Sequence, residues 1–142
     1  MPTIRIHGTE LNYTDRDIIT FDEGMIGMPH LRRMVLVNQN DIAPFLWLAS
    51  LDDPEVAFLV LEPSGYFADY APPIPADTHR RINLAGEERP LVLLLVTLLA
   101  AWQQSTINLR APIVIAPQAM RGVQMILTGS PYSLTEPLPL AA

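Results

Sequence analysis

The sequence predicts an all-β fold, in the form of a small mixed or antiparallel barrel with one or two short helical turns. Apolar runs of strand length, rich in β-branched and aromatic residues, follow one another along the chain. Proline accounts for 14 of 142 residues and is scattered between these runs, as expected where strands end often. A chain of this length suits one domain, which we expect to span residues 1–142.

The clearest element is a β-hairpin between Pro44 and Pro63. Two apolar runs, Phe45–Leu51 and Val56–Leu61, each have the length of a strand, and a proline stands at each outer end. The residues between them, Asp52–Glu55, are typical of a turn, because Asp bonds its own backbone and Pro fixes φ. We therefore expect two core strands joined by an acidic turn.

The chain before this hairpin predicts further short strands and turns. Gly24 and Gly27 indicate a turn that needs positive φ or a close backbone approach. Pro29–Arg33 has Pro at its start and is expected to form one helical turn. Extended runs are expected at Thr3–His7, Leu11–Thr14, Asp17–Phe21 and Met34–Val37.

The chain after the hairpin contains an aromatic loop and the best helix candidate. Tyr66, Phe67 and Tyr70 either cover a barrel end or sheet edge, or form a binding surface. Asp77–Leu84 is expected to be a short helix, with Asp77 as its N-cap and Gly86 as its stop.

The last third of the chain begins with Pro90–Leu99, which is apolar on both faces. Its short length and its initial proline favour a strand covered on both sides, as in a barrel with something packed against it. Beyond it we expect extended runs at Thr106–Arg110, Ile113–Ile115 and Val123–Leu127, a turn at Pro117–Gly122, and an irregular tail from about Thr128.

Composition excludes several classes of protein. A net charge of −6 argues against sequence-independent nucleic-acid binding, which needs a basic face, and is compatible with a basic protein partner. There is no cysteine, so disulfides, thiolate metal sites and a cysteine nucleophile are excluded. The longest apolar run, Leu91–Ala101, is far shorter than the roughly 20 residues of a membrane-spanning helix. Hydrophobic residues make up 49% of the chain, enough for a core and a partner-binding patch.

No catalytic or cofactor motif is recognisable, so we expect no catalytic residues, no metal site and no cofactor. Adjacent acids such as Glu87-Glu88 are typical of solvated turns, whereas catalytic pairs more often meet from separate elements. The alternative function is a small hydrolase or metal-dependent enzyme on a barrel-like fold, with a deep pocket that gathers a histidine and carboxylates. The histidines lie far apart and match no metal-binding spacing: His7, His30 and His79.

Several segments stand in a distinctive order: FLWLASLDDPEVAFLVLEP in the hairpin, INLRAPIVI (Ile107–Ile115), RGVQMIL (Arg121–Leu127) and PYSLTEPL (Pro131–Leu138). Together they resemble the flagellar assembly factor FliW family. The earlier segment DIITFDEGMIGMPHLRRMVLV (Asp17–Val37) is similar to that family's strand, Glu-Gly turn and following strand. The resemblance runs in the same order from about Asp17 to Leu138 and covers nearly the whole chain.

This resemblance implies a bacterial cytoplasmic protein with an all-β pseudo-barrel, no catalysis, and contact with neither membrane nor nucleic acid. It implies two partners. One is the translational regulator CsrA, which the family removes from messenger RNA, and the other is flagellin, which frees CsrA to repress flagellin synthesis. An acidic domain would meet the basic CsrA faster, most of all at low salt, and flagellin's helical termini need an apolar groove or patch.

The chain departs from the family pattern at four positions. The family often has Pro where this chain has Asp22 and Ile26, which predicts a less rigid turn. The family commonly has a basic pair before its C-terminal Pro-Leu, where this chain has Thr135 and Glu136. Contacts that those basic groups make with a partner are therefore in question for this chain.

Candidate partner-binding residues lie in the hairpin, in the aromatic loop and before Pro112. The aromatic residues of the first hairpin strand are expected partly in the core, and those from the acidic turn to the aromatic loop are expected to be exposed. Charge reversal at the two aspartates of the turn is predicted to slow association with CsrA. The asparagine before Pro112 is either a structural hydrogen-bonding residue or a contact. The candidates are Phe45, Trp47, Asp52, Asp53, Glu55, Asp69, Tyr70 and Asn108.

Overall fold

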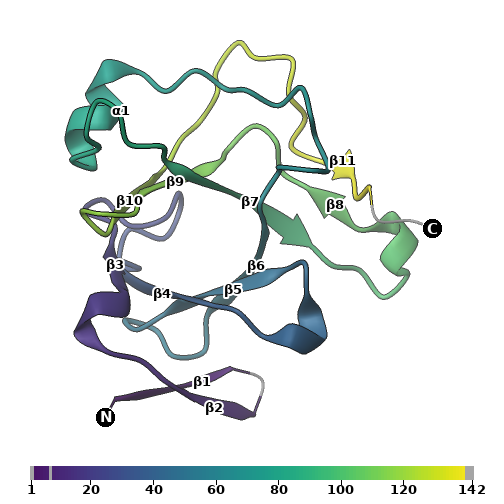
Figure 1. Ribbon diagram of the computed structural model, residues 1–142. Helices are drawn as coiled ribbons and strands as arrows, with labels where there is room; N and C mark the ends of the chain where they lie inside the picture. Colours follow the sequence, from purple (N-terminus) through teal and green to yellow (C-terminus); the bar gives the residue numbers. More distant parts are fainter. Residues whose placement is uncertain (1, 7, 140–142) are drawn as a thin grey trace.

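The computed structural model describes residues 2–6 and 8–139, and its regular secondary structure consists mainly of short strands joined by turns and loops (Figure 1). It contains one α-helix, and short 3-10 helices lie at Asp15–Asp17, Asn40–Ile42 and Trp102–Gln104. The elements are β1 (Thr3–Ile6), β2 (Thr9–Asn12), β3 (Ile18–Thr20), β4 (Arg33–Val37), β5 (Leu46–Ser50), β6 (Ala57–Leu61), α1 (Ala76–Arg81), β7 (Leu91–Thr97), β8 (Thr106–Ile107), β9 (Ile113–Ala116), β10 (Arg121–Gln124) and β11 (Glu136–Pro137).

The main sheet closes on itself as a barrel of 7 strands. Strands β7, β6, β5, β4 and β3 are antiparallel neighbours in that order, and β10 then joins β3 in parallel. Closure comes from β9, which pairs with β10 on one side and with β7 on the other. The predicted mixed, all-β barrel is therefore confirmed.

Strand β7 changes partner halfway along its length. Its first part, Leu91–Leu93, pairs with β9, and its last part, Val96–Thr97, pairs with β8, which in turn pairs with β11. Leu93 and Leu94 point to opposite faces and are both fully buried, as predicted for a strand covered on both sides. Beyond Leu93, β7 and β9 separate, so the barrel wall opens at this point.

The barrel interior is filled by side chains from most of its strands. Ile19, Met34, Leu48, Val60 and Leu93 meet there with Phe21, Leu31, Ile113 and Ile115 in one buried cluster. Phe21 explains the glycine of β10, because a Cβ at Gly122 would lie 2.6 Å from its ring.

The predicted hairpin between Pro44 and Pro63 is confirmed, and the first extended runs form a second hairpin. In the central hairpin, Trp47 faces Leu59 and Leu48 faces Phe58, so the strands pair along their length. β1 and β2 pair as an antiparallel hairpin that packs on Ala49 through Ile4 and Ile6. His7, assigned to the first extended run, lies outside the described residues.

The glycine turn, residues 22–28, takes the backbone conformation that its sequence predicts. Gly24 and Gly27 have φ of 70° and 78°, in the left-handed region that glycine favours. Gly24 also meets a close approach, because a Cβ there would lie 2.6 Å from the carbonyl oxygen of Pro29. Both parts of the prediction therefore hold at this position.

Other local predictions were wrong in their boundaries. The helix α1 starts one residue before Asp77, with Pro75 as its N-cap, and ends at Arg81 because Asn83 already has a positive φ of 56°. The expected helical turn at Pro29–Arg33 is instead a hydrogen-bonded turn, in which the amide of Leu31 donates to the carbonyl oxygen of Met28, and it leads straight into β4. β10 ends at Gln124 because Pro112, the residue opposite Met125, has no N–H to donate, although the amides of Met125 and Leu127 still donate to the carbonyl oxygens of Pro112 and Arg110.

Candidate functional site

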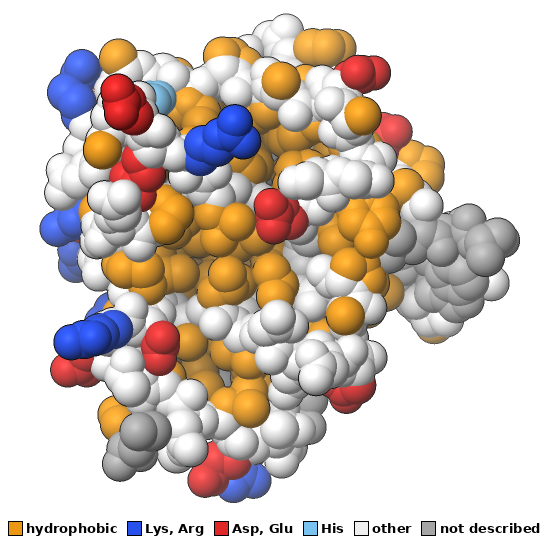
Figure 2. All heavy atoms as spheres, in the orientation of Figure 1, with side chains coloured by type: hydrophobic (Ala, Val, Ile, Leu, Met, Phe, Trp, Pro, Cys, Tyr) orange, Lys and Arg blue, Asp and Glu red, His pale blue; other side chains and the backbone are white. Residues whose placement is uncertain are grey.

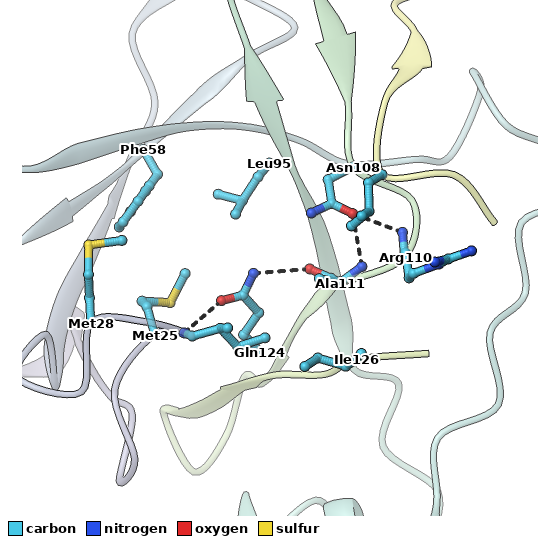
Figure 3. A pocket seen from close by; sticks show the side chains of 11 residues that line it. Met25, Met28, Phe58, Leu95, Asn108, Arg110, Ala111, Gln124 and Ile126 are labelled. Carbon is cyan, nitrogen blue, oxygen red and sulfur yellow. Dashed lines mark hydrogen bonds between the residues drawn. The ribbon is translucent and has the colours of Figure 1, made fainter. Parts of the chain in front are cut away.

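A pocket of about 440 Å³ lies where β7 parts from β9 (Figure 3). Its walls come from segments far apart in sequence: the glycine turn, β6, β7, the segment after β8, β10 and the tail. The lining residues are Met25, Ile26, Met28, Phe58, Leu95, Asn108, Arg110, Ala111, Gln124, Ile126 and Leu134. The pocket exists because β7 takes β8 as its new partner and leaves the barrel core accessible beside Leu95.

The floor of the pocket is apolar and is continuous with the barrel core. Met25 belongs to the buried core cluster, and Met28, Phe58 and Leu95 pack against it. Methionine is flexible and polarisable, so it adapts to apolar groups of different shape. The floor is therefore suited to an apolar side chain inserted from outside.

The rim of the pocket carries apolar side chains that face water. Ile26, Ile126 and Leu134 are 45%, 56% and 52% exposed, and all three line the pocket. The space-filling view also shows hydrophobic side chains over the middle of one face, with basic side chains mostly along its left margin (Figure 2). Exposed apolar groups gathered around a concave surface mark a site that a partner covers.

The glycine turn forms one wall and is held at several points. The two carboxylate oxygens of Asp22 accept hydrogen bonds from Nη1 of Arg121, at 2.9 and 2.8 Å, and Glu23 forms a salt bridge with Arg81 at 2.6 Å. The amide of Ile26 donates to Gln124 Oε1 at 3.0 Å. The sequence predicted a less rigid turn, because the prolines common in the family are replaced here. In the structure, these contacts hold the turn and place the Ile26 side chain at the rim.

Asn108 is fixed by the backbone that follows it. Its Oδ1 accepts hydrogen bonds from the amides of Arg110 at 2.9 Å and Ala111 at 3.0 Å, which shows the structural role that the sequence allowed. These bonds determine the orientation of the amide, and Nδ2 points to the pocket side (Figure 3). Asn108 therefore combines a structural role with a donor that lines the pocket.

Arg110 connects the pocket to the tail. Its Nε donates to the carbonyl oxygen of Tyr132 at 2.9 Å and its Nη2 to that of Ser130 at 3.3 Å. The amide of Leu109 donates to Ser133 at 2.9 Å. These bonds hold the tail where Leu134 forms part of the rim.

The acidic turn is more strongly bound by its own fold than the sequence suggests. Asp52 Oδ2 accepts from the amides of Arg32 and Arg33 at 2.8 and 2.7 Å, and its Oδ1 accepts from Arg33 Nε at 3.1 Å. Partial burial raises the pKa of Asp52, but these hydrogen bonds outweigh it and the pKa lies below its ordinary value. Asp52 is exposed, as expected, but its carboxylate is already engaged by hydrogen bonds within the protein.

The remaining acids of the hairpin and the aromatic loop are less constrained. The amide of Asp53 donates to Ser50 Oγ at 2.9 Å, and Asp53 Oδ1 accepts from the amide of Glu55 at 3.2 Å. Asp53 is half-buried, whereas Glu55 and Asp69 are exposed, as predicted. Glu55 and Asp69 thus remain accessible to a partner.

The predicted aromatic residues pack on the barrel. Phe45 is half-buried against Leu61 and Leu94, and Trp47 is half-buried against the β1–β2 hairpin, so both lie partly in the core as expected. Tyr70 was expected to be exposed, which is wrong. It is half-buried, its hydroxyl donates to Leu109 at 2.7 Å, and its ring meets that of Tyr132 edge-on at 4.7 Å.

Asn108 is the predicted site residue that lines the pocket, and the other candidates lie elsewhere. Sequence reasoning missed the exposed rim because its members come from three separate segments. One signal was present at RGVQMIL, where Met125, Ile126 and Leu127 are consecutive apolar residues in an extended chain. Alternation sends the middle one outward, so an exposed apolar group was predictable there.

The described residues give the alternative enzyme hypothesis no positive support. No group of three His, Asp or Glu among them could hold a metal ion, and the pocket is lined by none of these residue types. His30 and His79 lie outside that lining, and His7 is not among the described residues. Separately, no helix in the described ranges is long and apolar enough to cross a membrane.

Fold and pocket together define a small β-barrel protein with a protein-interaction surface. The family model described as "FliW protein" matches residues 5–138. A "Flagellar assembly factor FliW 2" from Desulfotalea psychrophila is 35% identical over 98% of this chain and 91% of its own length. A "Flagellar assembly factor FliW" from Thermotoga sp. (strain RQ2) is 36% identical over 88% of this chain and 85% of its own.

A solved structure agrees with these relatives. The "Crystal structure of the flagellar assembly factor FliW" superposes with a TM-score of 0.86 at 29% identity, covering 96% of this chain and 94% of that one. The chain belongs to the FliW family, whose matched members are named as flagellar assembly factors and not as enzymes. The resemblance drawn from the sequence is thereby confirmed.

Proposed function

We propose that this flagellar assembly factor works in the cytoplasm as a switch between two protein partners, flagellin and the translational regulator CsrA. Bound to CsrA, it keeps this repressor away from messenger RNA, so flagellin is made. Free flagellin displaces CsrA, which then represses further synthesis. Export of flagellin into the growing filament would reverse the exchange and couple translation to assembly.

The observation that carries the proposal is the apolar pocket with its exposed rim. The family resemblance implies that flagellin's helical termini need an apolar groove or patch on this protein. Ile26, Ile126 and Leu134 are too exposed to serve the core of this protein, and they surround a floor that accepts apolar groups. We assign flagellin to this surface.

The proposal for CsrA rests on charge. The net charge of −6 favours encounter with a basic protein, and Glu55 and Asp69 are exposed acids at the hairpin turn and the aromatic loop. Asp53 contributes from the same turn, and we include the half-buried Phe45 and Trp47 of the hairpin and Tyr70 of the aromatic loop as further candidate contacts. Asn108 belongs to the pocket and hence to the flagellin surface.

The test is a competition experiment with purified proteins. We expect flagellin monomers and CsrA each to bind with micromolar or tighter affinity in calorimetry at low salt, and flagellin to release CsrA from a preformed complex. Raising the salt concentration should weaken CsrA binding more than flagellin binding, because charge screening acts on the former. Absence of binding to both partners at low salt would refute the proposal.

A further inference from the structure

The pocket differs in charge from the protein that contains it. The chain carries a net charge of −6, but Asp and Glu are absent from the described residues that line the pocket, and Arg110 lies among them. Arg110 has no carboxylate partner among the described residues. Other arginines do pair with acids: Arg5, Arg33, Arg80, Arg81 and Arg121. The half-buried guanidinium of Arg110, beside an apolar pocket, is therefore available to pair with an anionic group of a ligand.

The polar side chains of the pocket offer donors. Nε and Nη2 of Arg110 point to carbonyl oxygens of the tail, which fixes the guanidinium and leaves its other N–H groups available. Nδ2 of Asn108 has no acceptor among the described residues, because the two bonds of this side chain use Oδ1. Gln124 is satisfied within the protein, with Oε1 bound to Ile26 and Nε2 bound to Ala111. A fitting ligand therefore supplies oxygen acceptors, and negative charge at the Arg110 edge.

The exposed rim indicates the size of the ligand. A small molecule that filled the floor would leave Ile26, Ile126 and Leu134 in water. A helix, about 10 Å wide, covers a rim of this kind while side chains at i, i+3, i+4 and i+7 reach the floor. The apolar rim thus favours a helix over a small carboxylate.

We infer that the pocket selects an amphipathic helix whose apolar stripe is flanked by a carboxylate that meets Arg110. The inference rests on the proposed function, since it defines the partner chemistry of the surface assigned to flagellin. It makes Arg110 and Asn108 specificity-determining residues: Arg110 attracts the carboxylate, and the Asn108 donor disfavours a cation in the pocket.

The test uses three synthetic helical peptides of about 18 residues, or about five turns. All carry leucines at i, i+3, i+4 and i+7 in an Ala–Gln background, and they differ at one flanking position, which is Glu, Gln or Lys. Fluorescence anisotropy with the full chain should give the Glu peptide about fivefold tighter binding than the Gln peptide at low salt. The Lys peptide should bind weakest.

Two variants connect this preference to the pocket. Arg110→Gln should remove the difference between the Glu and Gln peptides. Asn108→Asp keeps an oxygen for the amides of Arg110 and Ala111 but replaces the donor by a negative acceptor, so it should shift preference toward the Lys peptide. Arg16→Gln, an equal charge change at an exposed residue before β3, is the matched control and should leave the preference intact. Unfolding curves check that each variant is folded.

The outcomes separate this inference from the proposed function. Equal binding of all three peptides, or equal weakening of all three by Arg110→Gln, overturns the carboxylate preference. If the protein binds laurate but none of the peptides at concentrations up to about 1 mM, the inference of a helical ligand is overturned. The same conclusion follows if it binds neither laurate nor any peptide. If these peptide tests fail but the protein still binds flagellin, the proposed function remains supported. If the protein selects the Glu peptide but does not bind flagellin, the helix-binding pocket remains supported and flagellin is refuted as its partner.

Discussion

The turn between β5 and β6 and the pocket beside β7 both gather side chains of functional type, but they differ in how far the fold itself uses them. In the turn, the Asp52 carboxylate already accepts three hydrogen bonds from Arg32 and Arg33. In the pocket, Ile126 and Leu134 are more than half exposed, and Nδ2 of Asn108 has no acceptor in the described part of the chain. Groups satisfied within the protein support its stability, and groups left unsatisfied are available for binding.

The largest effect is expected on stability, from Asp52→Ala. Removal of this carboxylate leaves the amides of Arg32 and Arg33 without their acceptor and should cost about 2 kcal/mol of unfolding free energy, measured by urea denaturation. Flagellin affinity should not change. Glu55→Ala, in the same turn but exposed, is the control and should stay within about 0.5 kcal/mol. An Asp52→Ala variant as stable as the parent would show that the turn is not structural.

The next effect is expected on binding, from Ile126→Glu. A charge placed on the pocket rim should weaken flagellin binding by about tenfold, or ~1.4 kcal/mol, in calorimetry. Stability should barely change, because this side chain is already 56% exposed. Leu98→Glu is a close control, since Leu98 is also 56% exposed but lies outside the pocket lining. If both variants weaken binding equally, added charge and not the pocket is responsible.

A smaller effect is expected in the acid stability of Asp52→Asn. The folded pKa of Asp52 lies below the ordinary value of 3.8. Its ionised form therefore stabilises the fold fully above the unfolded pKa, and this stabilisation is lost as the pH falls through the folded pKa. Between about pH 5 and pH 2 the variant should lose less unfolding free energy than the parent chain, since Asn accepts hydrogen bonds without titrating. Parallel curves from thermal unfolding would contradict this role.

The same contrast explains what could be predicted from the sequence. The hairpin strands, the glycine turn and the buried strand Leu91–Thr97 follow from local patterns, and each was found close to its predicted place. The pocket depends on β7 exchanging β9 for β8, a long-range choice that no local pattern encodes. The hydrogen bonds of Asp52 could not be predicted for a related reason: its partners Arg32 and Arg33 lie at or just before the start of β4, so the turn alone could not reveal them.

The smallest effect is expected on the rate of CsrA association, from Glu55→Lys. Glu55 is exposed, and its hydrogen bond to Asp53 uses the backbone amide of Glu55, so reversal of its side-chain charge should leave the turn folded. Association at low salt should slow by about threefold, and the difference should vanish at about 1 M salt, where charges are screened beyond roughly 3 Å. Glu87→Lys makes the same change of net charge after α1 and is the control. Equal slowing by both variants in stopped-flow measurements would assign the effect to the overall charge of the protein and not to the turn.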